Sequence, residues 1–93
     1  MPKGSWRDSL TDNLCEAFAK LGTRDEVYAF LEDVASIGEI KSMAQRLEVA
    51  RLLSEGMKYP EIVRVFGAST ATISRVKKCL DYGTGGYESV LKE

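Results

Sequence analysis

The sequence predicts an all-α protein of about six helices that includes a helix-turn-helix. Apolar residues recur at spacings of three and four along most of the chain, which is the period of amphipathic helices. Glycines interrupt these periodic segments, and serine or threonine precedes glutamate by three residues at two expected helix starts. No stretch shows convincing alternation of apolar and polar residues between turn signals, so we expect no strands. A chain of 93 residues predicts a single domain, residues 1–93.

The first three helices follow in order along the amino-terminal half. Residues 8–21 are expected to form the first helix, and Gly22 is expected to end it as a glycine just beyond the helix. Thr23 and Glu26 have the spacing of a capping box and predict a second helix over 24–34. Ser36 and Glu39 repeat this spacing before the longest helix, which runs to Gly56. The apolar stripe of this third helix comprises Ile40, Met43, Ala44, Leu47, Ala50 and Leu53.

Three shorter helices complete the chain. Pro60 suits the first turn of a helix, so residues 60–66 are expected to be helical and to end at Gly67. Either Ser69 or Thr70 caps a fifth helix that extends to about residue 80. The glycine-rich run 83–86 predicts a loop, because continuing a helix through it costs backbone entropy. A last short helix is expected over 87–91.

Residues 59–80 have the pattern of a helix-turn-helix, in which two helices cross steeply over a short turn that contains glycine. Gly67 supplies that turn. The expected inner faces consist of apolar side chains that pack the two helices together. They are Ile62, Val63 and Phe66 on the first helix, Ala68 in the turn, and Ile73 and Val76 on the second helix.

The outer face of the second helix is polar and basic, which suits a nucleic-acid groove. Short side chains near its start allow close approach to base edges, and the Thr70 methyl or Ala71 can contact a thymine methyl. Longer cations such as Lys77 can contact phosphates. The candidate DNA-binding residues are Arg64, Ser69, Thr70, Ala71, Thr72, Ser74, Arg75, Lys77 and Lys78.

Charge is distributed unevenly along the chain, although the formal net charge is only −1. Residues 1–37 carry net −3, whereas residues 57–80 carry five basic and one acidic side chain, net +4. A local basic segment attracts polyanions, but an ordinary solvated face has the same composition. Together with the spacing, this favours duplex DNA. The alternative is a helix-turn-helix that binds protein or RNA, with no effector.

Composition argues against several other classes of protein. The chain has no histidine, and Cys15 and Cys79 form no metal-binding pair, so no metal or cofactor is expected. Each cysteine is expected to be a small buried side chain. No phosphate-binding loop or nucleophile and base pair indicates an enzyme. The absence of a signal peptide and of a long apolar run predicts a cytoplasmic protein without a membrane span.

The sequence resembles the Trp repressor family, especially its Trp-repressor-like branch of small bacterial regulators. The resemblance lies in residues 52–56 and 66–75, most specifically in the phrase Gly67-Ala68-x-x-Ala71-Thr72-Ile73-x-Arg75. It spans about residues 8–92 and is strongest over 46–80. It implies an intertwined homodimer in which each subunit supplies one recognition helix, and a repressor of transcription. A two-fold dimer is expected to bind double-stranded DNA at a pseudo-palindromic operator with half-sites one helical turn apart.

The resemblance also implies a small-molecule site between two arginines, matched here by Arg46 and Arg75. Val76 stands where tryptophan-binding members have glycine, and Cys79 stands where they have the serine that receives the ligand's amino group. The leucines that cover the ligand are matched by Asp33 and Ala35. These departures argue against tryptophan and leave open another small effector or none.

Overall fold

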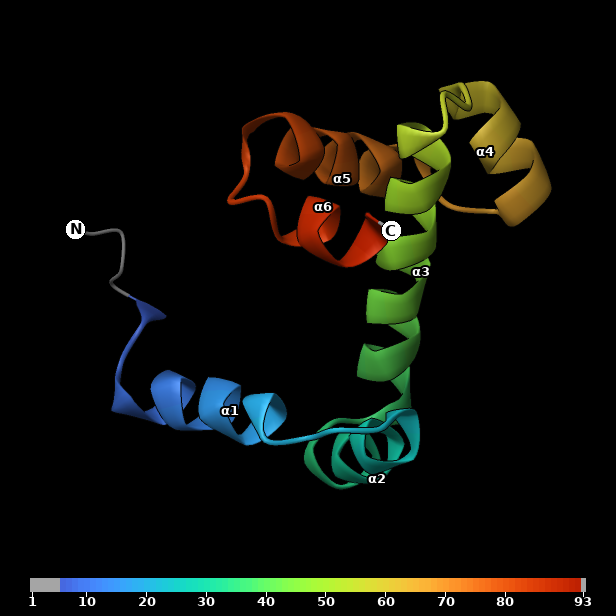
Figure 1. Ribbon diagram of the computed structural model, residues 1–93. Coiled ribbons are helices and arrows are strands. Elements are labelled where there is room, and N and C mark those ends of the chain that lie inside the picture. The colour runs from blue at the N-terminus through green and yellow to red at the C-terminus, as the bar shows by residue number, and fades with distance from the viewer. Residues whose placement is uncertain (1–5, 93) are drawn as a thin grey trace. The chain divides into compact units, whose positions relative to one another are not determined.

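The computed structural model describes residues 6–92, which form six α-helices and no strand. The predicted all-α fold of about six helices is therefore confirmed. In chain order the helices are α1 Ser9–Ala19, α2 Arg24–Val34, α3 Ile37–Ser54, α4 Tyr59–Phe66, α5 Thr70–Tyr82 and α6 Gly86–Leu91 (Figure 1).

The chain divides into two compact units, and the boundary falls between Ile37 and Gly38 at the start of α3. The first unit holds α1 and α2. The second holds nearly all of α3 together with α4, α5 and α6. The expectation that residues 1–93 form one domain stays a prediction.

Side-chain caps define the helix starts in the first unit. At α1, the Asp8 backbone N–H donates to Thr11 Oγ1 at 2.8 Å and the Thr11 N–H donates to Asp8 Oδ1 at 2.9 Å. The predicted capping box of Thr23 and Glu26 is present at α2, which has the predicted bounds. These reciprocal bonds satisfy backbone donors that have no partner within the helix.

The predicted role of Gly22 is wrong. The helix α1 already ends at Ala19, and Gly22 does not adopt the left-handed conformation of a helix-ending glycine. Its N–H instead donates to Glu26 Oε1 at 2.7 Å, so Gly22 belongs to the start of α2. The capping carboxylate therefore satisfies this amide and that of Thr23 together.

The first unit has no buried side chain among residues 6–37. The rings of Phe18 and Phe30 meet edge to face, with centroids 5.0 Å apart and an interplanar angle of 79°. This is a favourable aromatic geometry. Large apolar side chains nevertheless remain exposed on both helices, and they include Leu10, Leu14, Tyr28 and Val34.

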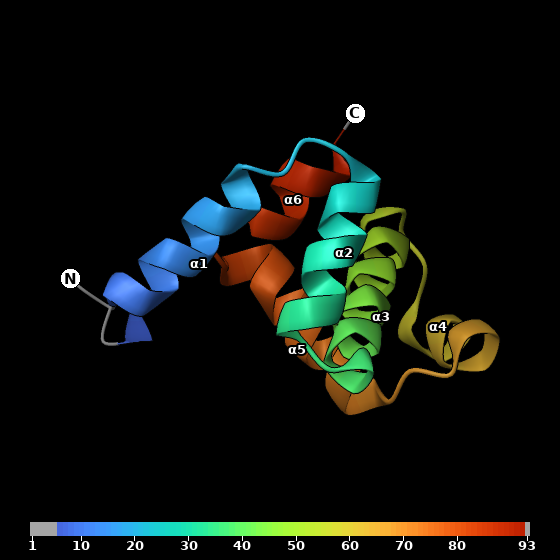
Figure 2. The ribbon, with the colours of Figure 1, turned by 90° about the horizontal axis from the view of Figure 1, so that it is seen from below.

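The buried core of the described chain lies in the second unit, where α3 passes between α4 on one side and the α5–α6 pair on the other (Figures 1 and 2). Its members are Val49, Ala50, Leu52, Ile62, Ala68, Ile73 and Val76. Ala50 lies in the core as predicted, but Met43 and Leu47 are exposed and Val49 and Leu52 take their place. Only the carboxyl-terminal half of α3 is covered by α4, α5 and α6, so its core face differs from the stripe predicted for the whole helix.

Glycines shape the carboxyl-terminal segment. Gly85 has a left-handed conformation with φ of 85°, and α6 begins at the next residue, one earlier than predicted. A Cβ on Gly83 would lie 2.4 Å from the backbone oxygen of Cys79, so a larger residue requires the chain to shift there. At Gly83 the backbone therefore passes close to the last turn of α5, and the Gly83 N–H donates to the Cys79 carbonyl at 2.8 Å.

Neither cysteine is buried. Cys15 on α1 and Cys79 on α5 are both exposed free thiols, so the predicted burial is wrong. Within residues 6–92 no cluster of three or more potential metal ligands occurs. Over the same residues, every helix is too short or too polar to cross a bilayer.

Candidate nucleic-acid interface

The helices α4 and α5 form the frame of the candidate interface and are joined by residues 67–69. Pro60 lies in the first turn of α4, where a missing N–H costs no helical hydrogen bond. Gly67 ends α4 with φ of 82°, and its N–H donates to the Val63 carbonyl at 2.9 Å. This left-handed residue turns the chain directly into α5, because glycine adopts positive φ without steric cost.

Four buried side chains fix α5 to the rest of the second unit. Ile62 and Ile73 are 0% exposed, and Ala68 and Val76 are nearly as buried. The prediction is wrong for Val63 and Phe66, which are 36% and 37% exposed. The helix α4 has only eight residues and contributes one buried side chain, so its inner face is narrower than the sequence pattern suggested. With this face of α5 held in the core, the opposite face, which carries Thr70, Ala71 and Ser74, is exposed.

The outer face of α5 carries most of the predicted contacts. Thr70, Ala71, Ser74, Arg75 and Lys78 are all exposed along it. The first three lie in the first two turns, and the cations follow them towards the carboxyl end. The helix therefore presents small groups where it begins and long basic groups further along.

Ser69 and Thr72 have a different arrangement. Ser69 is the N-cap of α5, which decides between the two predicted caps: its Oγ accepts a hydrogen bond from the Thr72 N–H at 3.1 Å. The same hydroxyl donates to Thr72 Oγ1, also at 3.1 Å. Both side chains thus order the first turn of the helix. Their predicted contact with DNA stays a prediction.

The basic residues fall into two groups. Lys77 Nζ donates to Asp81 Oδ1 at 3.2 Å, and Arg64 Nη2 lies 3.8 Å from Glu61 Oε2. Arg75 and Lys78 form no ion pair with any residue of 6–92. Asp81 lies just beyond residues 57–80, so the net charge of +4 for that segment does not include its carboxylate. Its spacing of four from Lys77 is the signal that identifies the pair.

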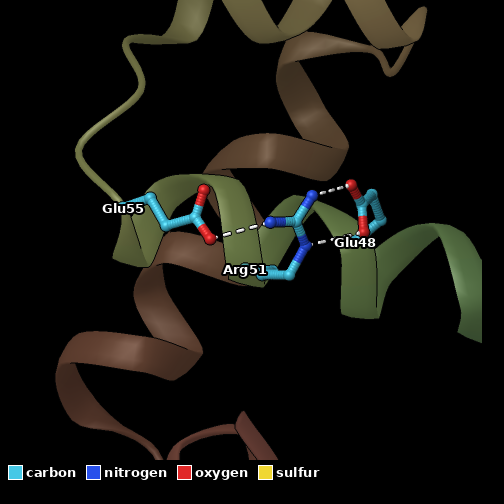
Figure 3. A network of polar contacts seen from close by, with 3 residues as sticks. All are labelled: Glu48, Arg51 and Glu55. Carbon is cyan, nitrogen blue, oxygen red and sulfur yellow. Dashed lines mark hydrogen bonds and ion pairs between the residues drawn. The ribbon is translucent and has the colours of Figure 1, made fainter. Parts of the chain in front are cut away.

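A second ion-pair network lies on the outer surface of α3. Arg51 lies between two carboxylates: its Nε donates to Glu48 Oε1 at 3.1 Å, and its Nη1 donates to Glu55 Oε2 at 2.7 Å (Figure 3). The hydrogen bond from Arg51 holds the pKa of Glu48 below its usual range, and the bond to Glu48 raises the pKa of Arg51. Sequence reasoning missed this network, although its i, i+3 and i, i+4 spacings are visible.

The residues matched to a small-molecule site differ in their exposure. Arg46 is half-buried on α3, and Arg75 is exposed on α5. Val76 belongs to the buried core, and Cys79 is exposed. Cys79 lines two open grooves beside α5 and α6, of about 430 and 530 Å³, and neither is lined by Arg46 or Arg75. The effector site stays a prediction.

Comparison with known proteins gives consistent matches over most of the chain. The family model described as Trp repressor protein matches residues 9–93. "Uncharacterized protein YerC" of Bacillus subtilis (strain 168) is 52% identical over 80 residues, which are 86% of this chain and 77% of that protein.

Two solved structures are similar in fold and sequence. One is described as the "Crystal structure of a putative Trp repressor from Staphylococcus aureus"; it has a TM-score of 0.89 and 41% identity, over 98% of this chain and 91% of the other. The other is a TrpR like protein from Eubacterium eligens ATCC 27750, with a TM-score of 0.88 and 44% identity, over 95% and 91% of the two chains.

Proposed function

The chain belongs to the Trp repressor family, and from this premise we propose that it is a sequence-specific DNA-binding transcription regulator that acts as a repressor. In this proposal α4 and α5 are the helix-turn-helix, and α5 is the recognition helix that enters the major groove.

The exposed face of α5 is the observation that carries the proposal. Ala71 and Ser74 are exposed on a helix whose opposite face is fixed by buried Ile73 and Val76. Small outward side chains allow the helix to approach base edges, while Arg75 and Lys78 are available for phosphates. A rigid helix with this order of groups provides both sequence recognition and electrostatic attachment.

We propose further that the regulator is a homodimer on a pseudo-palindromic operator. The exposed apolar side chains of α1 and α2 are more readily explained by burial against a second copy than by permanent exposure to water. A two-fold dimer presents two recognition helices, so its half-sites lie one turn of DNA apart, about 34–36 Å.

We do not propose tryptophan as the effector. Val76 and Cys79 replace the small residue and the hydroxyl at the two matched positions, and a thiol is a weaker hydrogen-bond partner than a hydroxyl. Arg46 and Arg75 remain the residues proposed to contact any other small effector.

Selection of bound sequences from a random duplex pool tests this function. We expect enrichment of one pseudo-palindromic sequence and a steep loss of binding as salt rises, because contacts to phosphates release counterions. Parallel selections with tryptophan and with a metabolite mixture test for an effector. Failure to enrich any duplex, together with binding to RNA or to a protein, would favour the alternative helix-turn-helix function.

A further inference from the structure

We propose that Asp81 limits the sequence-independent affinity of the recognition helix for DNA by holding the Lys77 ammonium group. The inference rests on the proposed function and deepens it, because it identifies a positioning residue that regulates attachment to phosphates. Asp81 is not expected to contact bases. It acts through Lys77.

The ion pair places a negative charge beside one of the phosphate-binding cations. Lys77 Nζ lies 3.2 Å from Asp81 Oδ1, one helical turn away on α5, and both side chains are partly exposed. An exposed pair of this kind is weak, so a phosphate can displace the carboxylate. The displaced carboxylate then lies near that phosphate and repels it. Lys77 therefore contributes less to DNA affinity than an unpaired lysine.

The helix dipole does not explain the position of Asp81. The helix ends at Tyr82 and has no basic residue in its last turn. A carboxylate there faces the negative end of the helix dipole, which is unfavourable. Glu61, which lies beside Arg64, occupies the first turn of α4, where an acidic residue stabilises the helix. Asp81 has no such favourable position relative to the dipole, and its contact in the structure is with Lys77.

The other cations of the helix lack this restraint. Arg75 and Lys78 form no ion pair with residues 6–92, so their charges are available to DNA phosphates. The recognition helix thus has two available cations and one that is restrained. A regulator competes against a large excess of non-operator sites, so weaker attachment to arbitrary DNA leaves more protein free to find its operator.

A double-mutant cycle with Asp81→Asn and Lys77→Gln tests the inference. The full-length protein and its variants are titrated with a labelled duplex of arbitrary sequence between 50 and 200 mM salt. In Asp81→Asn, no carboxylate opposes the phosphate contact of Lys77, so this contact should count in full and steepen the salt slope by up to about 0.9 per subunit. Over this salt range, the affinity of Asp81→Asn should then fall by up to roughly three-fold more per subunit than that of wild type.

The effect of Asp81→Asn must disappear when Lys77 is already glutamine. If Asp81→Asn strengthens binding equally in the Lys77→Gln background, Asp81 repels DNA directly and the inference is wrong. Asp81→Glu keeps the carboxylate and should therefore bind DNA as the wild type does. Glu16→Gln is the charge-matched control: Glu16 is exposed on α1 and forms no ion pair within residues 6–92, so its removal should leave the salt slope unchanged.

Elution from a heparin column separates this inference from the proposed function. Heparin is a polyanion without base pairs, and Asp81→Asn should elute at higher salt than wild type only when Lys77 is present. Absence of duplex binding by the wild type, with this elution order intact, would refute the proposed function, and it would reduce the inference to a restraint of Lys77 by Asp81 towards polyanions in general. Coincident elution of wild type and Asp81→Asn would overturn the inference whatever the duplex result.

Discussion

Ala71 and Lys78 leave the recognition helix about 10 Å apart along its axis, and they are expected to affect DNA binding in different ways. Ala71→Leu places a bulky group where close approach to bases is proposed. It should change or abolish sequence preference and leave weak non-specific binding intact. Lys78→Ala should lower affinity for all duplexes to a similar degree and reduce the salt slope by about one per lost contact. Competition between operator and arbitrary duplexes measures both effects.

Matched circular dichroism spectra are required for this comparison, because a distorted α5 also weakens binding. The proposed orientation of α5 is wrong if Lys78→Ala changes which sequence is preferred while Ala71→Leu does not.

Glu48 predicts a pH dependence of stability. The bond from Arg51 lowers the pKa of the folded Glu48 carboxyl below its value in the unfolded chain. The pair therefore stabilises the fold above the ordinary pKa of glutamate and loses this contribution as pH falls through the lowered pKa. Glu48→Gln should cost a few tenths of a kcal/mol at pH 7, since the pair is partly exposed and screened by solvent.

Urea unfolding of wild type and Glu48→Gln at pH 7 and pH 3 measures this difference. We expect the free energies of unfolding to differ at pH 7 and to converge in acid. A difference that persists unchanged at pH 3 would mean that Glu48 acts through packing.

For single residues of α5, helical spacing predicted correctly which side chains are buried and which are exposed. The outward positions of Ala71 and Ser74 followed from helical spacing alone. The engagement of Ser69 with Thr72 did not, because a hydroxyl at a helix start can bind either its own backbone or DNA. Asp81 was missed since the ion pair depends on a residue beyond the boundary assumed for the helix-turn-helix.

The cap of α5 gives a prediction at the scale of a whole element. Ser69→Ala removes the acceptor for the Thr72 N–H and should destabilise the protein by about 1 kcal/mol. Ser69→Asp retains an acceptor and should keep most of the stability. Thermal unfolding of both variants tests this. Equal losses in the two variants would show that the hydroxyl contributes by something other than capping.

Local chemistry explains why some helix ends were predictable and others were not. The capping box of Thr23 and Glu26 depends on residues three apart, so α2 was predicted with its correct bounds. The role of Gly22 depended on which of two neighbouring helices satisfies its N–H, and glycine is compatible with either. In α3, periodicity indicated an apolar stripe but not which half of the helix other elements would cover.

The whole molecule is expected to be a dimer in solution. Light scattering at micromolar concentration should give twice the 10.3 kDa mass of the chain. Leu14→Glu introduces a charge into the apolar stripe of α1 and should weaken association at least ten-fold, because burial of a leucine contributes about 1.5–3 kcal/mol. Ala19→Glu adds the same charge on the opposite side of α1 and serves as the control.

A wild-type mass equal to one chain would contradict the dimer. Equal effects of Leu14→Glu and Ala19→Glu would instead show that the stripe is not the contact surface. Sequence periodicity identifies an apolar face but gives no information on whether the same chain or a second copy covers it. For this reason the exposure of Val63, Phe66 and Leu47 could not be predicted, whereas the six-helix order could.

The lack of any buried side chain in residues 6–37 has a consequence for the turnover of the protein. If α1 and α2 are covered only by a second copy, a newly made chain exposes them until it meets a partner, and proteases act on such segments. Survival then depends on abundance: sparse chains are degraded and plentiful ones are protected. Chains diluted at cell division would be lost faster than simple dilution predicts, so repression would end abruptly below a threshold number of copies.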